Sequence, residues 1–228
     1  MCDELLKISV IVPLYHGKKY LDQLHKMIRE AANRVSDIAR IEWVISNDLA
    51  DEIVEPIKDS LLDVVVLNSS VNKGIQGARV TGLKNSNGEF VLFLDQDDMI
   101  YPDYFASQLD NIDNADAVVC NAIHDGKPMY PSGDRVSLAE CVKKDFSLKI
   151  GCGFIPGQVL IRKEKIPQVW IDNWLSYNCC DDYYLWLCMH ANGCVFAVNN
   201  EVLYEHIVRG QNQGNDSYSW YKSTMEML

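Results

Sequence analysis

The sequence predicts an α/β fold with a Rossmann-like, mostly parallel central sheet flanked by helices. Apolar, β-branched runs alternate with segments of helical periodicity through the first half of the chain, as in consecutive β-α-β units. At 90–94, five apolar residues follow one another without a polar break, which is typical of a strand buried on both faces. Because the strands of such a sheet run parallel, their carboxyl ends meet at one edge, where ligands bind.

Composition limits the classes of function. The 228 residues are 48% hydrophobic and 23% charged, enough for one domain with a sizeable core. A net charge of −11 argues against nucleic-acid binding and gives no basic patch for an anionic membrane. The apolar runs are too short to span a bilayer, and the first residues do not resemble a signal peptide. Eight cysteines without a CxxC pair are expected to be reduced and structural. We expect a cytoplasmic protein, with at most a peripheral association with the inner face of the membrane.

Strands are predicted where β-branched and aromatic residues cluster between turn residues. In chain order these segments are 7–15, 41–46, 63–67, 90–94, 117–123, 158–161, 195–198 and 202–206. Helices are predicted where apolar residues recur at helical spacing. They are 20–35, 51–61, 75–84, 104–112, 136–146 and 182–191.

Some of these helices carry residues that need explanation. Pro56 is an awkward interior residue for the helix at 51–61. Gly77 and Gly82 weaken the helix at 75–84, so they are expected to permit the close approach of a neighbour. Asp181 is the expected N-cap of the helix at 182–191.

Carboxylates follow the central apolar run directly. If the chain is still extended there, Asp95 and Asp97 point to the same side. Two such carboxylates repel each other unless a cation lies between them, and oxygen ligands favour magnesium, manganese or calcium. The alternative is a solvated acidic turn, with Asp103 starting the next helix. Tyr15 and Asp48 also follow strand ends, so the topology places them at the same edge.

Four motifs in order resemble family 2 glycosyltransferases of the GT-A fold. The opening strand reads Ile8-Ser-Val-Ile-Val-Pro-Leu-Tyr15. Next, Asn72-Lys-Gly74 with Ala78-Arg79 and Thr81-Gly82-Leu83 resembles the family's "NKG…AR…TGL" segment. Phe93-Leu-Asp-Gln-Asp-Asp98, followed by Tyr101-Pro-Asp103, resembles "FLDSDD…YPD", which contains the DxD motif. Asp181-Asp182 resembles the acceptor-side "ED" motif. The resemblance covers residues 7 to about 206.

The resemblance implies an inverting, metal-dependent hexosyltransferase-type enzyme that uses a nucleotide-diphosphate sugar, usually a UDP-sugar. Its acceptor is a carbohydrate or lipid-linked saccharide in bacterial cell-surface polysaccharide or glycolipid synthesis. A divalent cation would neutralise the departing diphosphate, and a base would take the acceptor proton. The family's base position matches Asp182, and Asp181 matches the preceding glutamate. The implied metal, Mn²⁺ or Mg²⁺, would be held by Asp97, Asp95 and His206. The donor-binding residues are then Pro13, Tyr15, Asp48, Lys73, Arg79, Asp95, Gln96, Asp97 and Arg209.

The same resemblance implies a single GT-A domain over 1–228, with a donor half at 1–103 and a smaller, mixed acceptor half at 104–228. Trp174, Tyr183 and Trp186 are either an acceptor platform or core residues. One departure is the family's "VDDGSTD", which is here Ser46-Asn-Asp-Leu-Ala-Asp51. It leaves two alternatives open: a catalytically silent sugar-nucleotide or carbohydrate-binding module, and a nucleotidyltransferase, for which 14–19 is a poor phosphate loop.

Overall fold

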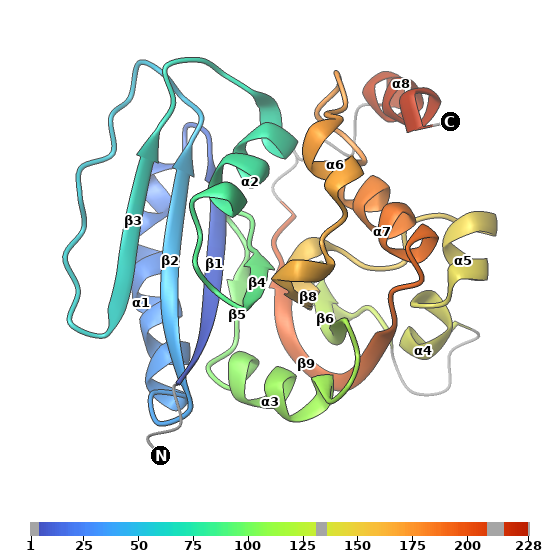
Figure 1. The fold of residues 1–228 in the computed structure, drawn as a ribbon, viewed down its shortest axis with the longest axis horizontal. Helices are drawn as coiled ribbons and strands as arrows, with labels where there is room; N and C mark the ends of the chain where they lie inside the picture. The colour runs from blue at the N-terminus through green and yellow to red at the C-terminus, as the bar shows by residue number, and fades with distance from the viewer. Residues whose placement is uncertain (1–4, 131–135, 209–216, 228) are drawn as a thin grey trace.

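The computed structural model describes residues 5–130, 136–208 and 217–227, and in this part nine strands form one continuous sheet (Figure 1). The strand order is β3-β2-β1-β4-β8-β6-β9-β5, and β7 pairs with β6. Their bounds are β1 Leu6–Leu14, β2 Ala39–Asn47, β3 Leu62–Asn68, β4 Phe90–Phe93, β5 Met99–Ile100, β6 Ala117–His124, β7 Lys127–Pro128, β8 Val159–Arg162 and β9 Phe196–His206. The α/β fold class is confirmed.

The first four strands of this order are parallel. β1 lies between β2 and β4 and pairs in parallel with both, and β2 pairs in parallel with β3. The hydrophobic interior of β1 is fully buried from Ile8 to Leu14, as expected for a strand covered on both faces. The carboxyl ends of β1, β2 and β4 therefore come together at one edge of the sheet.

The direction of the sheet changes at β8, which runs antiparallel to both of its neighbours, β4 and β6. Beyond it, β6 and β9 are parallel and β5 is antiparallel to β9. The two strands expected at 195–198 and 202–206 are one long strand, β9. Its register against β6 shifts around Asn121, where the hydrogen-bond ladder is irregular.

Helices cover both faces of the sheet (Figure 1). One core cluster joins α1 (Leu21–Arg34) and α3 (Tyr104–Ile112) to one face. The other face packs against α2 (Gly74–Lys84), α6 (Gln168–Asp172) and α7 (Asp181–Ala191). In α2, a side chain at Gly82 would place its Cβ 2.4 Å from Ile11 Cγ2. The expected close approach at Gly82 is therefore confirmed. No helix in the described part of the chain is long and apolar enough to cross a membrane.

Two helix predictions were wrong in whole or in part. Residues 51–61 form no helix: Asn47 and Asn68 hydrogen-bond the backbone of Glu52 and Val54, and Pro56 is unfavourable inside a helix. The helix expected at 136–146 is divided into α4 (Leu138–Cys141) and α5 (Lys144–Lys149). Two helices were not predicted: α6 and α8 (Ser217–Met227).

Candidate functional site

Shortly after β4, the residues from Asp95 to Asp98 form a tight turn. The backbone N–H of Asp98 donates to the carbonyl of Asp95, with an N···O distance of 3.2 Å. The expectation that the chain stays extended, so that Asp95 and Asp97 share a side, was therefore wrong. Side chains two residues apart share a side only where the chain is extended, and the strand β4 ends at Phe93. The turn instead directs its side chains toward different elements.

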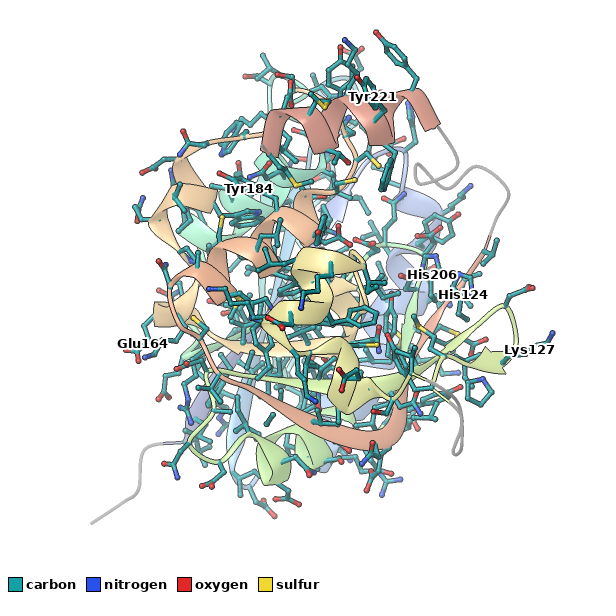
Figure 2. All side chains as sticks on the ribbon, turned by 90° about the vertical axis from the view of Figure 1, so that its right-hand side faces the viewer. His124, Lys127, Glu164, Tyr184, His206 and Tyr221 are labelled. Carbon is teal, nitrogen blue, oxygen red and sulfur yellow. The ribbon has the colours of Figure 1, made fainter. Side chains whose placement is uncertain are left out.

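Asp98 anchors the turn to β9. Its carboxylate is 1% exposed and accepts hydrogen bonds from the hydroxyl of Tyr204 and from the Ile207 N–H at 2.9 Å. Nδ1 of His206 lies 3.1 Å from the same carboxylate. The Asp98 hydrogen bond, offset in part by burial, raises the pKa of His206. The His206 ring also stacks on His124, with centroids 5.2 Å apart (Figure 2).

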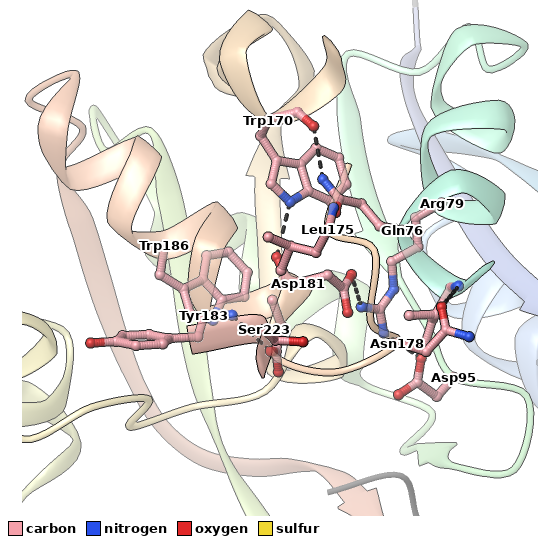
Figure 3. A network of polar contacts seen from close by, with 12 residues as sticks. Gln76, Arg79, Asp95, Trp170, Leu175, Asn178, Asp181, Tyr183, Trp186 and Ser223 are labelled. Carbon is pink, nitrogen blue, oxygen red and sulfur yellow. Dashed lines mark hydrogen bonds and ion pairs between the residues drawn. The ribbon is translucent and has the colours of Figure 1, made fainter. Parts of the chain in front are cut away.

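Asp95 points to α2, where Arg79 joins it to Asp181 at the start of α7. Nη2 of Arg79 lies 2.6 Å from Asp95, and Nη1 lies 2.6 Å from Asp181 (Figure 3). The Arg79 side chain is 3% exposed. Burial opposes its charge, but Asp181 and Asp95 more than compensate and hold the pKa of Arg79 above its ordinary value. The buried guanidinium of Arg79 thus links the DxD segment to the start of α7.

A second polar contact supports this link. Gln76, one turn before Arg79 on α2, donates through Nε2 to the carbonyl of Trp170 at 2.9 Å. Its Oε1 accepts the N–H of Leu175 at 2.8 Å (Figure 3). Trp170 in turn donates its indole N–H to the carbonyl of Asp181 at 2.9 Å. The position of Asp181 is therefore fixed through both its side chain and its backbone.

Asp182 lies beside this buried ion triad, on the first turn of α7. The expected N-cap was wrong: Cys180, in a left-handed conformation with φ of 62°, precedes the helix, and Asp181 is its first residue. Asp182 is half-buried. Burial and the neighbouring Asp181 carboxylate raise its pKa to about 6. A carboxylate that is ionised at neutral pH and has a raised pKa suits a general base.

Tyr15, Asp48 and Lys73, three of the predicted donor-binding residues, lie after the ends of β1, β2 and β3. Asp48 is 4% exposed, and its two oxygens accept the Lys73 N–H at 2.9 and 2.8 Å. Burial raises the pKa of Asp48 despite these bonds. Asp48 and Lys73 border a cavity of about 330 Å³ at the ends of β2 and β3. Tyr15 is 46% exposed, whereas Pro13 is buried inside β1.

Gln96, between the two aspartates of the motif, turns back to β1. Its Oε1 accepts the Tyr15 N–H at 2.9 Å and its Nε2 donates to the Tyr15 carbonyl at 3.1 Å. The amide contacts the protein backbone rather than facing a donor directly.

The unusual residue Asn47 is fully engaged within its own loop. Nδ2 donates to the carbonyl of Glu52 at 2.5 Å and to Oδ1 of Asn68 at 2.9 Å, and Oδ1 accepts the Leu49 N–H at 3.2 Å. Asn68 also pairs with both backbone polar groups of Val54. An aspartate at position 47 could not donate these bonds. The departure from "VDDGSTD" is therefore accommodated by the loop itself.

The predicted metal ligands are close to one another but differ in orientation. Within 5–130, 136–208 and 217–227, no three His, Cys, Asp or Glu side chains are grouped tightly enough to hold a metal. Asp95 is turned toward Arg79, and Nδ1 of His206 toward Asp98. Arg209 lies outside the described residues. Of the aromatic residues, Trp186 is buried in the core and Trp174 is 42% exposed beside Gly77.

Two features were missed by reasoning from the sequence. Nothing local in the sequence pairs Asp98 with Tyr204 across about a hundred residues. A usable signal did exist for Arg79: it stands among small residues on a helix with two glycines, a composition that favours a face packed closely inward.

The model of the family described as glycosyl transferase family 2 matches residues 9–169. The chain belongs to this family. An uncharacterised glycosyltransferase of Haemophilus influenzae is 28% identical over 205 residues, which is 87% of this chain and 76% of that relative. An uncharacterised glycosyltransferase of Rickettsia typhi is 31% identical over 117 residues, covering 49% of this chain. The chain spans only 35% of that relative's length.

Comparison with solved structures shows that this chain has the GT-A fold. The Staphylococcus aureus protein TarS, residues 1–349 in complex with UDP-GlcNAc, matches with a TM-score of 0.69 and 18% identity. The match covers 97% of this chain and 65% of that one. A mannosyltransferase of Pyrobaculum calidifontis, in complex with GDP-Man and Mn²⁺, matches with a TM-score of 0.60 and 15% identity. That match covers 92% and 59% of the two chains.

Proposed function

We propose that this chain is an inverting glycosyltransferase that moves a sugar from a nucleotide-diphosphate donor to an acceptor hydroxyl. The observation that carries the proposal is the Arg79 bridge, which holds Asp95 of the donor segment and Asp181 of the acceptor segment 2.6 Å from one guanidinium. It brings the base candidate Asp182 to the edge where the nucleotide-side residues meet. UDP-sugar is the first donor candidate, because a related S. aureus protein is crystallised with UDP-GlcNAc.

Asp182 acts as the base in this proposal. Its pKa of about 6 keeps it ionised at neutral pH and leaves it able to take the acceptor proton as the hydroxyl attacks. The base lies on α7 and the diphosphate-side carboxylates follow β4, so the two groups come from different elements. Approach from opposite sides of the sugar is what inversion requires.

A divalent cation at the turn after β4 would require Asp95 to leave its ion pair with Arg79. We propose that Asp97 and Asp95 hold Mn²⁺ or Mg²⁺ together with Nε2 of His206. The contact between His206 Nδ1 and Asp98 supports this, because metal-binding histidines usually donate the other ring nitrogen to a carboxylate. When bound, such a cation neutralises charge on the departing diphosphate. Tyr15 and Asp48 are proposed to contact the nucleobase, and Lys73 and Arg209 the donor phosphates.

The experiment that tests the function is a thermal-shift screen of UDP, GDP and dTDP, with and without Mn²⁺. The matching nucleotide raises the melting temperature, because it binds only the folded chain. Asp97→Ala should abolish the Mn²⁺-dependent part of the shift. Equal shifts with and without Mn²⁺ would contradict the metal site.

Catalysis separates the proposal from its alternatives. Asp182→Asn should bind the nucleotide as well as the wild type but transfer no sugar from the matching donor. A binding module would show no transfer in the wild type either, and a nucleotidyltransferase would release pyrophosphate from a nucleoside triphosphate. The intact Asn47 loop gives no support to a silent module.

We propose that the acceptor is a carbohydrate or lipid-linked saccharide in bacterial surface polysaccharide or glycolipid synthesis. A matching S. aureus relative is named a poly(ribitol-phosphate) β-N-acetylglucosaminyltransferase.

A further inference from the structure

Gln96 makes a two-point contact with a residue on another strand end. Its side-chain amide accepts the Tyr15 N–H at 2.9 Å and donates to the Tyr15 carbonyl at 3.1 Å. The backbone pairing of β1 with β4 extends only to Ile11 and Phe93, with one further bond from Leu94 N–H to the Ile11 carbonyl. Beyond this point the Gln96 side-chain amide, rather than the backbone, makes the hydrogen bonds between the end of β1 and the segment after β4.

This contact depends on the length of glutamine. A shorter polar side chain such as serine could not span the same gap with both a donor and an acceptor. Gly17 makes room for the longer side chain. A Cβ at Gly17 would lie 2.2 Å from Gln96 Oε1, although Gly17 has an ordinary φ of −107°. The small residue and the long residue are matched to each other.

The contact also completes the fixation of the turn. Asp95 is held by Arg79 on α2, and Asp98 is held by Tyr204 and Ile207 on the β9 side. Gln96 supplies the bond toward β1. Tyr15 and the DxD turn are consequently connected through one rigid amide, although they lie 81 residues apart in sequence.

We propose that Gln96 is a positioning residue that fixes the spacing between the nucleobase side and the diphosphate side of the donor site. This inference rests on the proposed function. If the spacing is fixed, a ligand that reaches both sides gains from simultaneous contact, as a bivalent ligand does. Gln96 then determines how strongly the site prefers a nucleoside diphosphate to a monophosphate, without itself touching the ligand.

The test compares UDP with UMP by titration calorimetry in the presence of Mn²⁺. Gln96→Met keeps the length and removes both hydrogen bonds. We expect UDP to bind about tenfold more weakly and UMP at most about threefold more weakly. The two lost hydrogen bonds connect the nucleobase side to the diphosphate side, and UDP depends on both sides more than UMP does. The ratio of the UMP dissociation constant to the UDP dissociation constant should therefore fall. Gln23→Met, on the exposed face of α1, is the matched control and should keep the wild-type ratio.

Gly17→Ala tests the same contact from the other partner. Its Cβ displaces the Gln96 amide, so the ratio of the UMP dissociation constant to the UDP dissociation constant should fall as it does in Gln96→Met. An unchanged ratio in both folded variants would overturn the inference, even if both melt at lower temperature, because general destabilisation weakens both ligands alike. Failure of wild-type protein to bind any of UDP, GDP and dTDP would instead refute the proposed function, and the inference with it.

Discussion

The raised pKa of Asp182 predicts a conflict between stability and activity. In the folded chain, burial and the Asp181 carboxylate raise the pKa of Asp182 from 3.8 to about 6. Asparagine at this position has the same shape and carries no charge. We therefore expect Asp182→Asn to stabilise the protein at neutral pH while it abolishes transfer.

The sign and size follow from proton linkage. Well below pH 4 the carboxyl is protonated in both the folded and the unfolded chain, so the substitution changes little there. As the pH rises from about 4 to 6, the unfolded chain loses its proton first, and the wild type loses stability. Each pH unit in this window corresponds to about 1.4 kcal/mol, so the limit is about 3 kcal/mol. Solvent reaches the half-buried side chain, and we expect about 1–3 kcal/mol.

Urea unfolding at pH 4 and pH 7.5 measures this difference. The free energy of unfolding of Asp182→Asn should exceed that of the wild type at pH 7.5 and approach it at pH 4. Asp110→Asn, an exposed residue of α3, is the control for a change in net charge. If Asp182→Asn shifts the free energy of unfolding equally at both pH values, Asp182 is not the group whose ionisation the fold disfavours.

Three further predictions concern contacts around the site. Arg79→Met leaves two carboxylates without their cation, so the free energy of unfolding should fall by about 3–5 kcal/mol, with Arg79→Lys recovering part of it in thermal melts. Gly82→Ala should cost about 1–3 kcal/mol through contact with Ile11, and adding Ile11→Ala should relieve some of that cost. Asp98→Asn should lower stability by about 1–3 kcal/mol, because asparagine cannot accept all the bonds that Tyr204 and its neighbours donate. Stability unchanged in any of these variants would contradict the contact concerned.

Much of the first half of the fold is predictable because its signals are local. The β-branched run at 7–15 corresponds to β1, and the helix expected at 104–112 has the bounds of α3. The strand at 90–94 was recognised from its apolar content alone. The sequence did not show which strands lie beside it or in which direction they run, because burial on both faces occurs equally beside a parallel strand and beside the antiparallel β8.

The errors arose where side chains distant in sequence override local preference. The segment 51–61 has helical spacing, but Asn47 and Asn68 hydrogen-bond the backbone of Glu52 and Val54, which a helix would need for its own bonds. Asp181 has the chemistry of an N-cap, yet Arg79 engages its carboxylate, and the helix begins one residue earlier than an Asp181 cap implies.

The site was predicted as a set of residues but not as an arrangement. Strand-end logic placed Tyr15 and Asp48 at the same edge as the carboxylates, and the Gln96 contact with Tyr15 agrees with that placement. Chain order gave no means to foresee that Arg79 contacts Asp95 and Asp181 together, since 102 residues separate the two partners of the second contact.

The insertion of β8 between β4 and β6 has a consequence for assembly of the protein during synthesis. Until residues 159–162 emerge, β4 presents an open edge on the side where β8 will pair, and unpaired edges invite association with other chains. The N-terminal portion therefore cannot complete its sheet alone. Truncation before residue 159 should yield aggregating material rather than a smaller nucleotide-binding unit. Exchange of segments with relatives should succeed only when β4 and β8 are exchanged together.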